Sequence, residues 1–397
     1  MTIRLYDTAR RAVVPFEPDR VVRMYVCGIT PYDATHLGHA ATYLTYDLLV
    51  RRLQELGHEV RMVRNVTDVD DSILPRAREL GVPYLELAER ELLRFHADME
   101  ALDMLAPASE PRVTETIDEI IHMVAGLLDA GHAYLTHGTA YFDTSTFPRF
   151  GQLSHYARDQ MVRLARARGG NPDDPHRRDP LDFVLWQPSL PDEPAWRAPF
   201  GVGRPGWHIE CSAMALQELG PTLDLHGGGT DLIFPHHECE IAQSESFTGE
   251  PFVRHWLHSA MVAYEGEKMS KSLGNLVFVS DLLADHDPRA IRLALMRHHY
   301  RSGFEWHDTD IQDGDALLQR LGAAVRAPAG PDPRPFAARV RAALDDDLDA
   351  PRALEALAEL ADAVLSGGTE RDAPLVLVEL AGLVGVDLTR PVPGAGD

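Results

Sequence analysis

The stretch Met24-Tyr-Val-Cys-Gly-Ile-Thr-Pro-Tyr-Asp-Ala-Thr-His-Leu-Gly-His39 decides the fold of this chain. The residues from Val21 to Cys27 are rich in β-forming side chains and predict a strand. Residues 28–33 then turn the chain, and we expect a helix to begin near Gly38. Five leucines, at positions 44, 48, 49, 53 and 56, fall on one face of that helix, and Gly57 is a suitable stop. A strand that leads through a glycine loop into an amphipathic helix is typical of an α/β sheet.

A second strand is predicted from Val60 to Val66, and it ends in Asn65-Val-Thr-Asp-Val-Asp-Asp71. Strand, helix and strand in this order predict a doubly wound, Rossmann-like parallel sheet of the α/β class. Ligands of such sheets bind beyond the carboxyl ends of the strands. Residues 27–39 and 65–71 are therefore expected to lie together at a ligand-binding edge.

The rest of the chain predicts one insertion and one helical end. Helices are expected at about 84–103 and 113–131, a hairpin at 133–147, and a polar segment rich in Arg, Gly and Pro at about 155–182. The sheet resumes at 223–226, a helix follows at 236–247, and the chain after residue 272 reads as helical. We predict a split catalytic domain (1–115 and 183–265), an inserted segment (116–182), a loop with stem helices (266–310) and a C-terminal helical bundle (311–397).

Composition limits the partners of the protein. The 397 residues carry a net charge of −23, and the last 87 residues hold 15 acidic side chains against eight arginines. Nucleic-acid binding needs basic surface, so tRNA is not expected as a partner and a small acceptor fits better. The content of 45% hydrophobic residues, without an apolar run of membrane length or a secretory signal, predicts a globular protein with no membrane contact. Three cysteines, an odd number, favour the reducing cytoplasm. We expect a monomer.

Lysine occurs at only two positions, and both lie in Lys268-Met-Ser-Lys-Ser272. Of the 38 residues that are lysine or arginine, all the others are arginine. A compact, mobile ammonium suits a phosphate as a point charge, whereas the guanidinium is a rigid fork. We therefore expect Lys268 and Lys271 to bind a triphosphate.

Two histidines stand at the start of the first helix, in Thr35-His36-Leu37-Gly38-His39. A helix N-terminus presents free N–H groups and a positive dipole end, both of which favour phosphate. The imidazoles of His36 and His39 can donate to phosphate oxygens in a transition state, and Gly38 permits a close approach of a nucleotide base. Alone, two histidines three residues apart are weak evidence.

A zinc site is indicated by Cys27, by Cys211 in Pro205-Gly-Trp-His-Ile-Glu-Cys211, and by His236 in Pro235-His-His-Glu-Cys-Glu240. Two thiolates and one imidazole form an incomplete shell, as in catalytic zinc sites. Glu240 is a candidate fourth ligand, since it shares a helical face with His236. The alternative is that the cysteines are buried and unreactive, which is the reading for Cys239.

Other polar residues are candidate supports of the site. Asp231 in Gly227-Gly-Gly-Thr-Asp231 suits ribose hydroxyls, with a tight turn as the alternative. Trp207 and Thr67 are candidates for the wall of an amino-acid pocket. The acids at 68, 70 and 71 would anchor an ammonium or Mg²⁺, or else form a solvated strand end. His208 and His237 are read as hydrogen-bonded core histidines.

Together these motifs resemble the class I aminoacyl-tRNA synthetases, and most closely cysteinyl-tRNA synthetase and its paralogue, the ligases that join cysteine to glucosaminyl-inositol in mycothiol synthesis. The resemblance rests on residues 24–43, 205–214, 226–238, 258–262 and 268–275. The sequence is closer to the ligases at residues 24–43, 65–71, 168–172 and 299–306. Glu240, residues 182–186 and the sequence after His237 are closer to the synthetase.

The resemblance implies activation of L-cysteine by ATP with Mg²⁺ on a Zn²⁺ site, then transfer to the amine of an amino-sugar inositol. It implies charge stabilisation by His36, His39, Lys268 and Lys271. It also implies an adenylate pocket made of Cys27, Gly28, Ile29, Thr30, Thr42, Asn65, Val66, Thr67, Trp207, Gly229, Thr230, Asp231 and Val262. Cysteinyl-tRNA synthetase and a non-catalytic binding paralogue are the alternatives, and no residue is assigned as the base of the transfer step.

Overall fold

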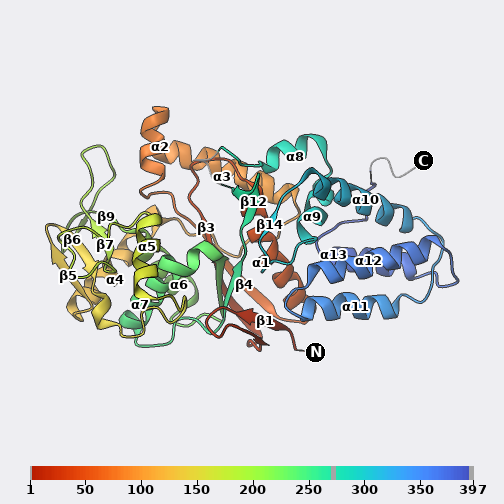
Figure 1. The fold of residues 1–397 in the computed structure, drawn as a ribbon, viewed down its shortest axis with the longest axis horizontal. Helices are drawn as coiled ribbons and strands as arrows, with labels where there is room; N and C mark the ends of the chain where they lie inside the picture. Colours follow the sequence, from red (N-terminus) through yellow and green to blue (C-terminus); the bar gives the residue numbers. More distant parts are fainter. Residues whose placement is uncertain (1, 270–273, 393–397) are drawn as a thin grey trace.

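The structure, a computed structural model, describes residues 2–269 and 274–392. A four-stranded sheet forms its centre (Figure 1), with strands β3 (Val21–Ile29), β4 (Glu59–Val66), β10 (Leu225–Gly229) and β11 (Trp256–Ser259) in the order β11-β10-β3-β4. All neighbouring strands are parallel. Helix α1 (Leu37–Glu55) joins β3 to β4 and begins one residue before the predicted start. The predicted doubly wound parallel sheet is confirmed.

The central sheet is buried on both faces, because successive residues of β3 point into different cores. Val22, Met24 and Val26 pack in one cluster with α1 and the C-terminal helices. Tyr25 and Cys27 pack in the other, with helices that precede and follow the second sheet. Near-continuous burial of this kind is typical of a parallel strand.

A second, antiparallel sheet lies at one end of the molecule (Figure 1). It contains β5 (Ala133–Thr136), β6 (Thr139–Phe142), β7 (Phe183–Gln187), β9 (Gly201–Pro205) and β8 (Trp196–Ala198), in that order across the sheet. Helices α2 (Ile73–Leu80), α3 (Tyr84–Ala101) and α4 (Ile117–Asp129) lead to it from β4, and α5 (Arg158–Ala167) lies between β6 and β7. Since β7 to β9 follow residue 182, this sheet spans the predicted limit of the insertion. The domain limits stay a proposal.

The chain returns to the central sheet through α6 (Trp207–Leu219) and α7 (Glu238–Thr248). A small sheet follows, made of β13 (Glu267–Lys268), β12 (Val262–Tyr264) and β14 (Phe304–Glu305) in that order. The expectation of a wholly helical chain after residue 272 was therefore wrong at β14. A strand of two residues is too short to leave a periodic pattern in the sequence.

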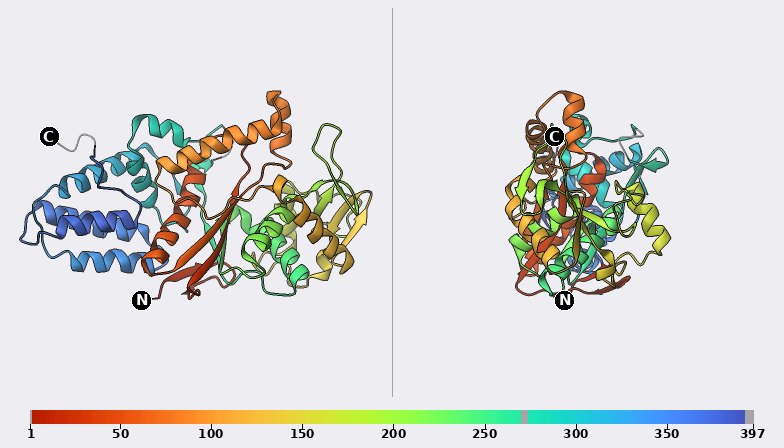
Figure 2. Two further views of the ribbon diagram at one scale, coloured as in Figure 1. Left: turned by 180° about the vertical axis from the view of Figure 1, so that it is seen from behind. Right: turned by 90° about the vertical axis from the view of Figure 1, so that its left-hand side faces the viewer.

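The helical end contains α8 (Val279–Asp285), α9 (Pro288–Met296), α10 (Asp308–Ala324), α11 (Arg334–Asp345), α12 (Ala350–Leu365) and α13 (Ala373–Leu383). Figure 2 shows, from behind, that α10 to α13 lie at the end opposite the antiparallel sheet. The buried guanidinium of Arg292, on α9, ties this end to the centre: it pairs with Asp47 of α1 and donates to the carbonyls of Val384 and Leu102 at 2.7 and 3.1 Å. Across the two described ranges, none of the helices has the length and apolar character that a membrane crossing requires.

Candidate active site

A cleft of about 940 Å³ opens at the carboxyl ends of the central strands. Its walls are the end of β3, the start of α1, the turns after β4 and β10, and residues 168–177 beyond α5. This is the edge at which the parallel-sheet rule places ligands. The predicted meeting of residues 27–39 and 65–71 at the cleft is confirmed only in part. After β4, Asp70 to Ser72 line the cleft, whereas Asn65 to Thr67 do not.

The end of β3 is held close to β4 at Gly28. Its N–H donates to Asn65 Oδ1 at 2.8 Å, and Asn65 Nδ2 donates in turn to Thr67 Oγ1 at 3.0 Å. A Cβ at position 28 would lie 1.6 Å from the carbonyl oxygen of Asn65, so no side chain fits there. Asn65 and Thr67 thus support the turn that exposes Cys27 and Thr30 to the cleft.

The two histidines at the start of α1 lie on the cleft wall, with their rings stacked 3.9 Å apart. His36 is the N-cap residue of α1, and its Nδ1 accepts from the N–H of Gly38 at 3.1 Å. A neutral ring that accepts at Nδ1 carries its proton at Nε2. Capping therefore fixes the tautomer that leaves an N–H donor on the far nitrogen of the ring.

The four predicted metal ligands converge beside the cleft. Cys27 of β3, Cys211 of α6, His236 and Glu240 each offer one ligand atom, and these atoms lie within 4.8 Å of one another. His236 stands in the irregular turn before α7, yet its Nε2 is 3.0 Å from Glu240 Oε1, as a shared helical face predicts. All four side chains are buried. Two sulfurs, a ring nitrogen and a carboxylate oxygen are zinc ligands, with bonds of about 2.0–2.3 Å, so the donor set fits this metal.

The charges of this cluster are strongly coupled. A hydrogen bond from Cys27, with help from His236, lowers the pKa of Cys211 to about 6. Burial, together with the charges of Cys211 and Glu240, raises the pKa of Cys27 well above its ordinary value. The cluster therefore holds a Cys211 that ionises readily beside a Cys27 that does not, and a divalent cation would allow Cys27 to ionise as well.

The protonation of His236 and Glu240 follows from the same coupling. Burial opposes a charge on His236, but Glu240 and Cys211 outweigh it and raise the pKa to about 10. Burial also opposes the charge on Glu240, but His226 and His236 lower its pKa to about 2. These shifts favour a charged imidazole beside a carboxylate at neutral pH, and a metal bound to His236 would displace its proton.

Sequence reasoning missed a second group of possible ligands: Cys27, His226, His237 and Glu240 also bring their ligand atoms within 4.8 Å of one another. His237 Nε2 lies 3.3 Å from Cys27 Sγ, and His226 Nε2 lies 3.0 Å from Glu240 Oε2. His237 was read as a hydrogen-bonded core histidine, and it is fully buried with its Nδ1 2.8 Å from His258. The available signal for His226 was its place near the start of β10, directly before three glycines.

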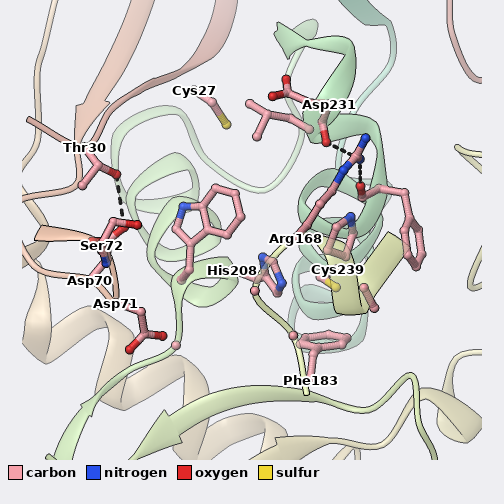
Figure 3. A pocket seen from close by; sticks show the side chains of 18 of the residues that line it. Cys27, Thr30, Asp70, Asp71, Ser72, Arg168, Phe183, His208, Asp231 and Cys239 are labelled. Carbon is pink, nitrogen blue, oxygen red and sulfur yellow. Dashed lines mark hydrogen bonds between the residues drawn. The ribbon is translucent and has the colours of Figure 1, made fainter. Parts of the chain in front are cut away.

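Aromatic and basic side chains complete the site (Figure 3). The Trp207 ring stacks on His236 at 4.2 Å, and His208 Nδ1 is 2.9 Å from the Nδ1 of His236. Arg168 follows α5 and donates to the carbonyl oxygens of Asp231 and Phe234, the bonds drawn in Figure 3. The segment that follows α5 is therefore hydrogen-bonded to the turn that carries Asp231. Cys239 is buried and belongs to neither group of possible ligands.

The cleft contains most of the predicted adenylate residues. Ten predicted residues line it: Cys27, Gly28, Ile29, Thr30, His36, His39, Thr42, Trp207, Gly229 and Asp231. Asn65, Val66, Thr67, Thr230 and Val262 are absent from the lining among the described residues. Lys268 ends β13, and the role of its side chain stays a prediction. The prediction for Lys271 lies outside the described residues.

Comparison with known proteins identifies the class. Residues 13–316 match the family model of the class I (C) tRNA synthetase catalytic domain. A methionyl-tRNA synthetase from Mycobacterium tuberculosis, solved with methionyl-adenylate, shares the fold with a TM-score of 0.64 at 19% identity, over 92% of this chain and 89% of that one. The chain belongs to the class I synthetase family of the cysteine type.

Within that class, curated relatives define a narrower family. A protein from Thermobispora bispora named L-cysteine:1D-myo-inositol 2-amino-2-deoxy-alpha-D-glucopyranoside ligase is 51% identical over 98% of this chain and 96% of its own length. A Streptosporangium roseum protein with the same name is 49% identical over 97% of this chain and 96% of its own length. The chain belongs to the family of these ligases, and the protein is a ligase built on a class I synthetase fold.

Proposed function

We propose that the protein activates L-cysteine with ATP as cysteinyl-AMP and transfers the cysteinyl group to the amine of 1-D-myo-inosityl 2-amino-2-deoxy-α-D-glucopyranoside, releasing pyrophosphate and AMP. The observation that carries the proposal is the group Cys27, Cys211, His236 and Glu240, which reaches the nucleotide-type cleft through Cys27. When bound there, zinc would hold the thiolate of the substrate, and a thiolate distinguishes cysteine from serine. The protein would act in the cytoplasm.

In the first step the carboxylate oxygen of cysteine attacks the α-phosphorus of ATP, and pyrophosphate leaves. His36 and His39 line the cleft at the N-terminus of α1, where the helix dipole adds positive potential, and their ring N–H groups would donate to the phosphate. Lys268 and Lys271 would neutralise the departing pyrophosphate. Mg²⁺ would accompany ATP, as in other nucleotide-dependent transfers.

In the second step the neutral amine nitrogen attacks the carbonyl carbon of cysteinyl-AMP. A C–N bond forms, the C–O bond to the phosphate breaks, AMP leaves with the electron pair, and the amine gives up a proton. Asp231 lies in the cleft with its main chain fixed by Arg168, which makes it the candidate to orient the amine. The base of this step is left unassigned.

Cysteinyl-tRNA synthetase is the second candidate function, because Glu240 lies against His236 as a fourth ligand would in that enzyme. The net charge of −23 argues against a large polyanionic acceptor. An assay of wild-type protein with cysteine and ATP, supplied with either the amino sugar or tRNA, separates the two. Consumption of the adenylate by tRNA alone would refute the proposed acceptor.

The metal is tested with a matched pair of variants, Cys211→Ser and Cys239→Ser. Both cysteines are buried, but only Cys211 belongs to a possible metal group. We expect wild type and Cys239→Ser to bind about one zinc per chain and to catalyse cysteine-dependent ATP–pyrophosphate exchange. Cys211→Ser should lose both zinc and exchange while keeping its circular dichroism spectrum. Exchange by Cys211→Ser, or equal exchange with serine, would refute the proposal.

A further inference from the structure

One end of the cleft lies between the turn after β4, at residues 70–72, and segment 169–177 after α5, neither of which belongs to the proposed adenylate residues. Two adenylate residues border it, because Thr30 donates to Asp70 at 3.2 Å and Arg168 donates to the carbonyl of Asp231. Figure 3 shows Asp70, Asp71 and Ser72 across the pocket from Arg168 and Asp231. Ligand pockets usually measure about 300–1,000 Å³. At about 940 Å³, the cleft is near the upper end of that range and has room for a second substrate beside an adenylate.

The chemistry of this end suits a polyhydroxylated amine. Six polar side chains line it, namely Asp71, Tyr141, Asn171, Asp174, Arg177 and Gln187. They offer carboxylates, amides, a phenol and a guanidinium, so donors and acceptors alternate around the space. Hydroxyl groups need both kinds of partner, and an ammonium group needs carboxylates.

The carboxylate of Asp174 is held in place before any ligand arrives. Its Oδ2 accepts from the Tyr141 hydroxyl at 2.6 Å, and its Oδ1 accepts from the N–H of His176 at 3.0 Å. Arg177 lies over the Tyr141 ring at 5.3 Å and donates to the carbonyl of Asp182 at 2.6 Å. A carboxylate has about four lone-pair sites, so Asp174 keeps acceptors for a ligand after these two bonds.

The opposite wall is fixed by a chain of charges. Arg204 pairs with Asp71, and on its other side its Nε lies 3.0 Å from Glu193. Gln187 of β7 reaches Asp71 at 3.5 Å. The turn after β4 is thereby tied to the antiparallel sheet, which sets the width of this end of the cleft.

We propose that this end of the cleft is the acceptor subsite, in which Asp174 and Asp71, from opposite walls, bind the hydroxyl and ammonium groups of the amino-sugar inositol. The inference rests on the proposed function and adds the residues that recognise the acceptor. Arg168, which joins segment 169–177 to the carbonyl of Asp231, aligns the subsite with the reacting carboxyl group.

The test uses Asp174→Asn and the matched control Asp173→Asn. Asp173 is the exposed neighbour, pairs with Arg166 at 2.7 Å and does not line the cleft. With the full-length zinc enzyme, we expect Asp174→Asn to raise the KM for the amino sugar about 10- to 100-fold, as for loss of a hydrogen bond to a charged group. Cysteine-dependent ATP–pyrophosphate exchange, measured without acceptor, should keep its rate in both variants. Tyr141→Phe, which frees the carboxylate, should raise the same KM by a smaller factor.

Each outcome of this test bears on either the acceptor subsite or the proposed function. An unchanged acceptor KM in Asp174→Asn would overturn the subsite while leaving the proposed function intact. Loss of exchange in Asp174→Asn would also overturn it, because the residue would then serve cysteine activation. Wild-type protein that exchanges pyrophosphate yet does not consume the amino sugar would refute the proposed function, and the subsite with it.

Discussion

Replacing Asp47 by asparagine should destabilise the whole protein, because it leaves Arg292 buried without its counter-charge. The Arg292 side chain is 1% exposed and Asp47 is 3% exposed, so the pair is shielded from water. Removing one partner of such a buried pair costs about 3–5 kcal/mol. Asp47 also accepts from Arg51 at 2.8 Å, so the carboxylate balances two guanidinium groups and we expect the upper part of that range.

The measurement is urea-induced unfolding followed by tryptophan fluorescence, with Asp103→Asn as the control. Asp103 lies 3.3 Å from Arg51 as well, but its side chain is 45% exposed. An exposed ion pair contributes about 0–1 kcal/mol, so the control should shift the unfolding free energy little. Equal, small shifts in the two variants would refute the argument from burial. Arg292→Met combined with Asp47→Asn should cost less than the two single changes added together.

The pH dependence supplies a second check on Asp47. Burial would raise its pKa, but Arg292 and Arg51 outweigh burial and lower it. A carboxyl with a lowered folded-state pKa stabilises the protein above its unfolded value of about 3.9, and this contribution is lost as the pH falls through the folded value. The stability difference between wild type and Asp47→Asn should therefore be constant near neutral pH and shrink below about pH 4.

Two further changes test the end of β3 and the start of α1. Gly28→Ala should abolish cysteine activation and lower stability by roughly 1–3 kcal/mol or more, because its Cβ meets the Asn65 carbonyl. The control Gly382→Ala has open space around its Cβ and should not destabilise the protein. Thermal unfolding and pyrophosphate exchange measure the two effects, and an active Gly28→Ala enzyme would contradict the close approach of Gly28 to Asn65. His36→Asn keeps a side chain that can cap α1 but removes the ring N–H, so the melting temperature should hold while exchange slows by about 10²–10³; an unchanged rate would remove His36 from the proposed chemistry.

The sequence predicted the centre of the molecule better than its ends. The 3.6-residue leucine pattern located α1 to within one residue at its start, and the apolar runs located β3 and β4, because burial on both faces leaves a strong signal. Short strands such as β14 leave none. The antiparallel sheet was also predicted only in part, since β7 pairs with β6 across a long intervening segment and the short strands β8 and β9 were not predicted.

Within the site, chemistry was easier to predict than supporting contacts. Cys27, Cys211, His236 and Glu240 were grouped by ligand type, and they lie together although the first and last are 213 positions apart. The second histidine set and the bonds from Arg168 to backbone carbonyls depend on the path of the chain between elements. No residue pattern encodes such a path.

The pairing of β14 with β12 has a consequence for how the protein is synthesised. The described lining of the cleft ends with Leu276, but the strand that pairs with β12 is supplied by Phe304 and Glu305. A ribosome-bound chain therefore contains all four candidate metal ligands before it contains the strand that pairs with β12. The small sheet is the later of the two to be completed as the chain is synthesised.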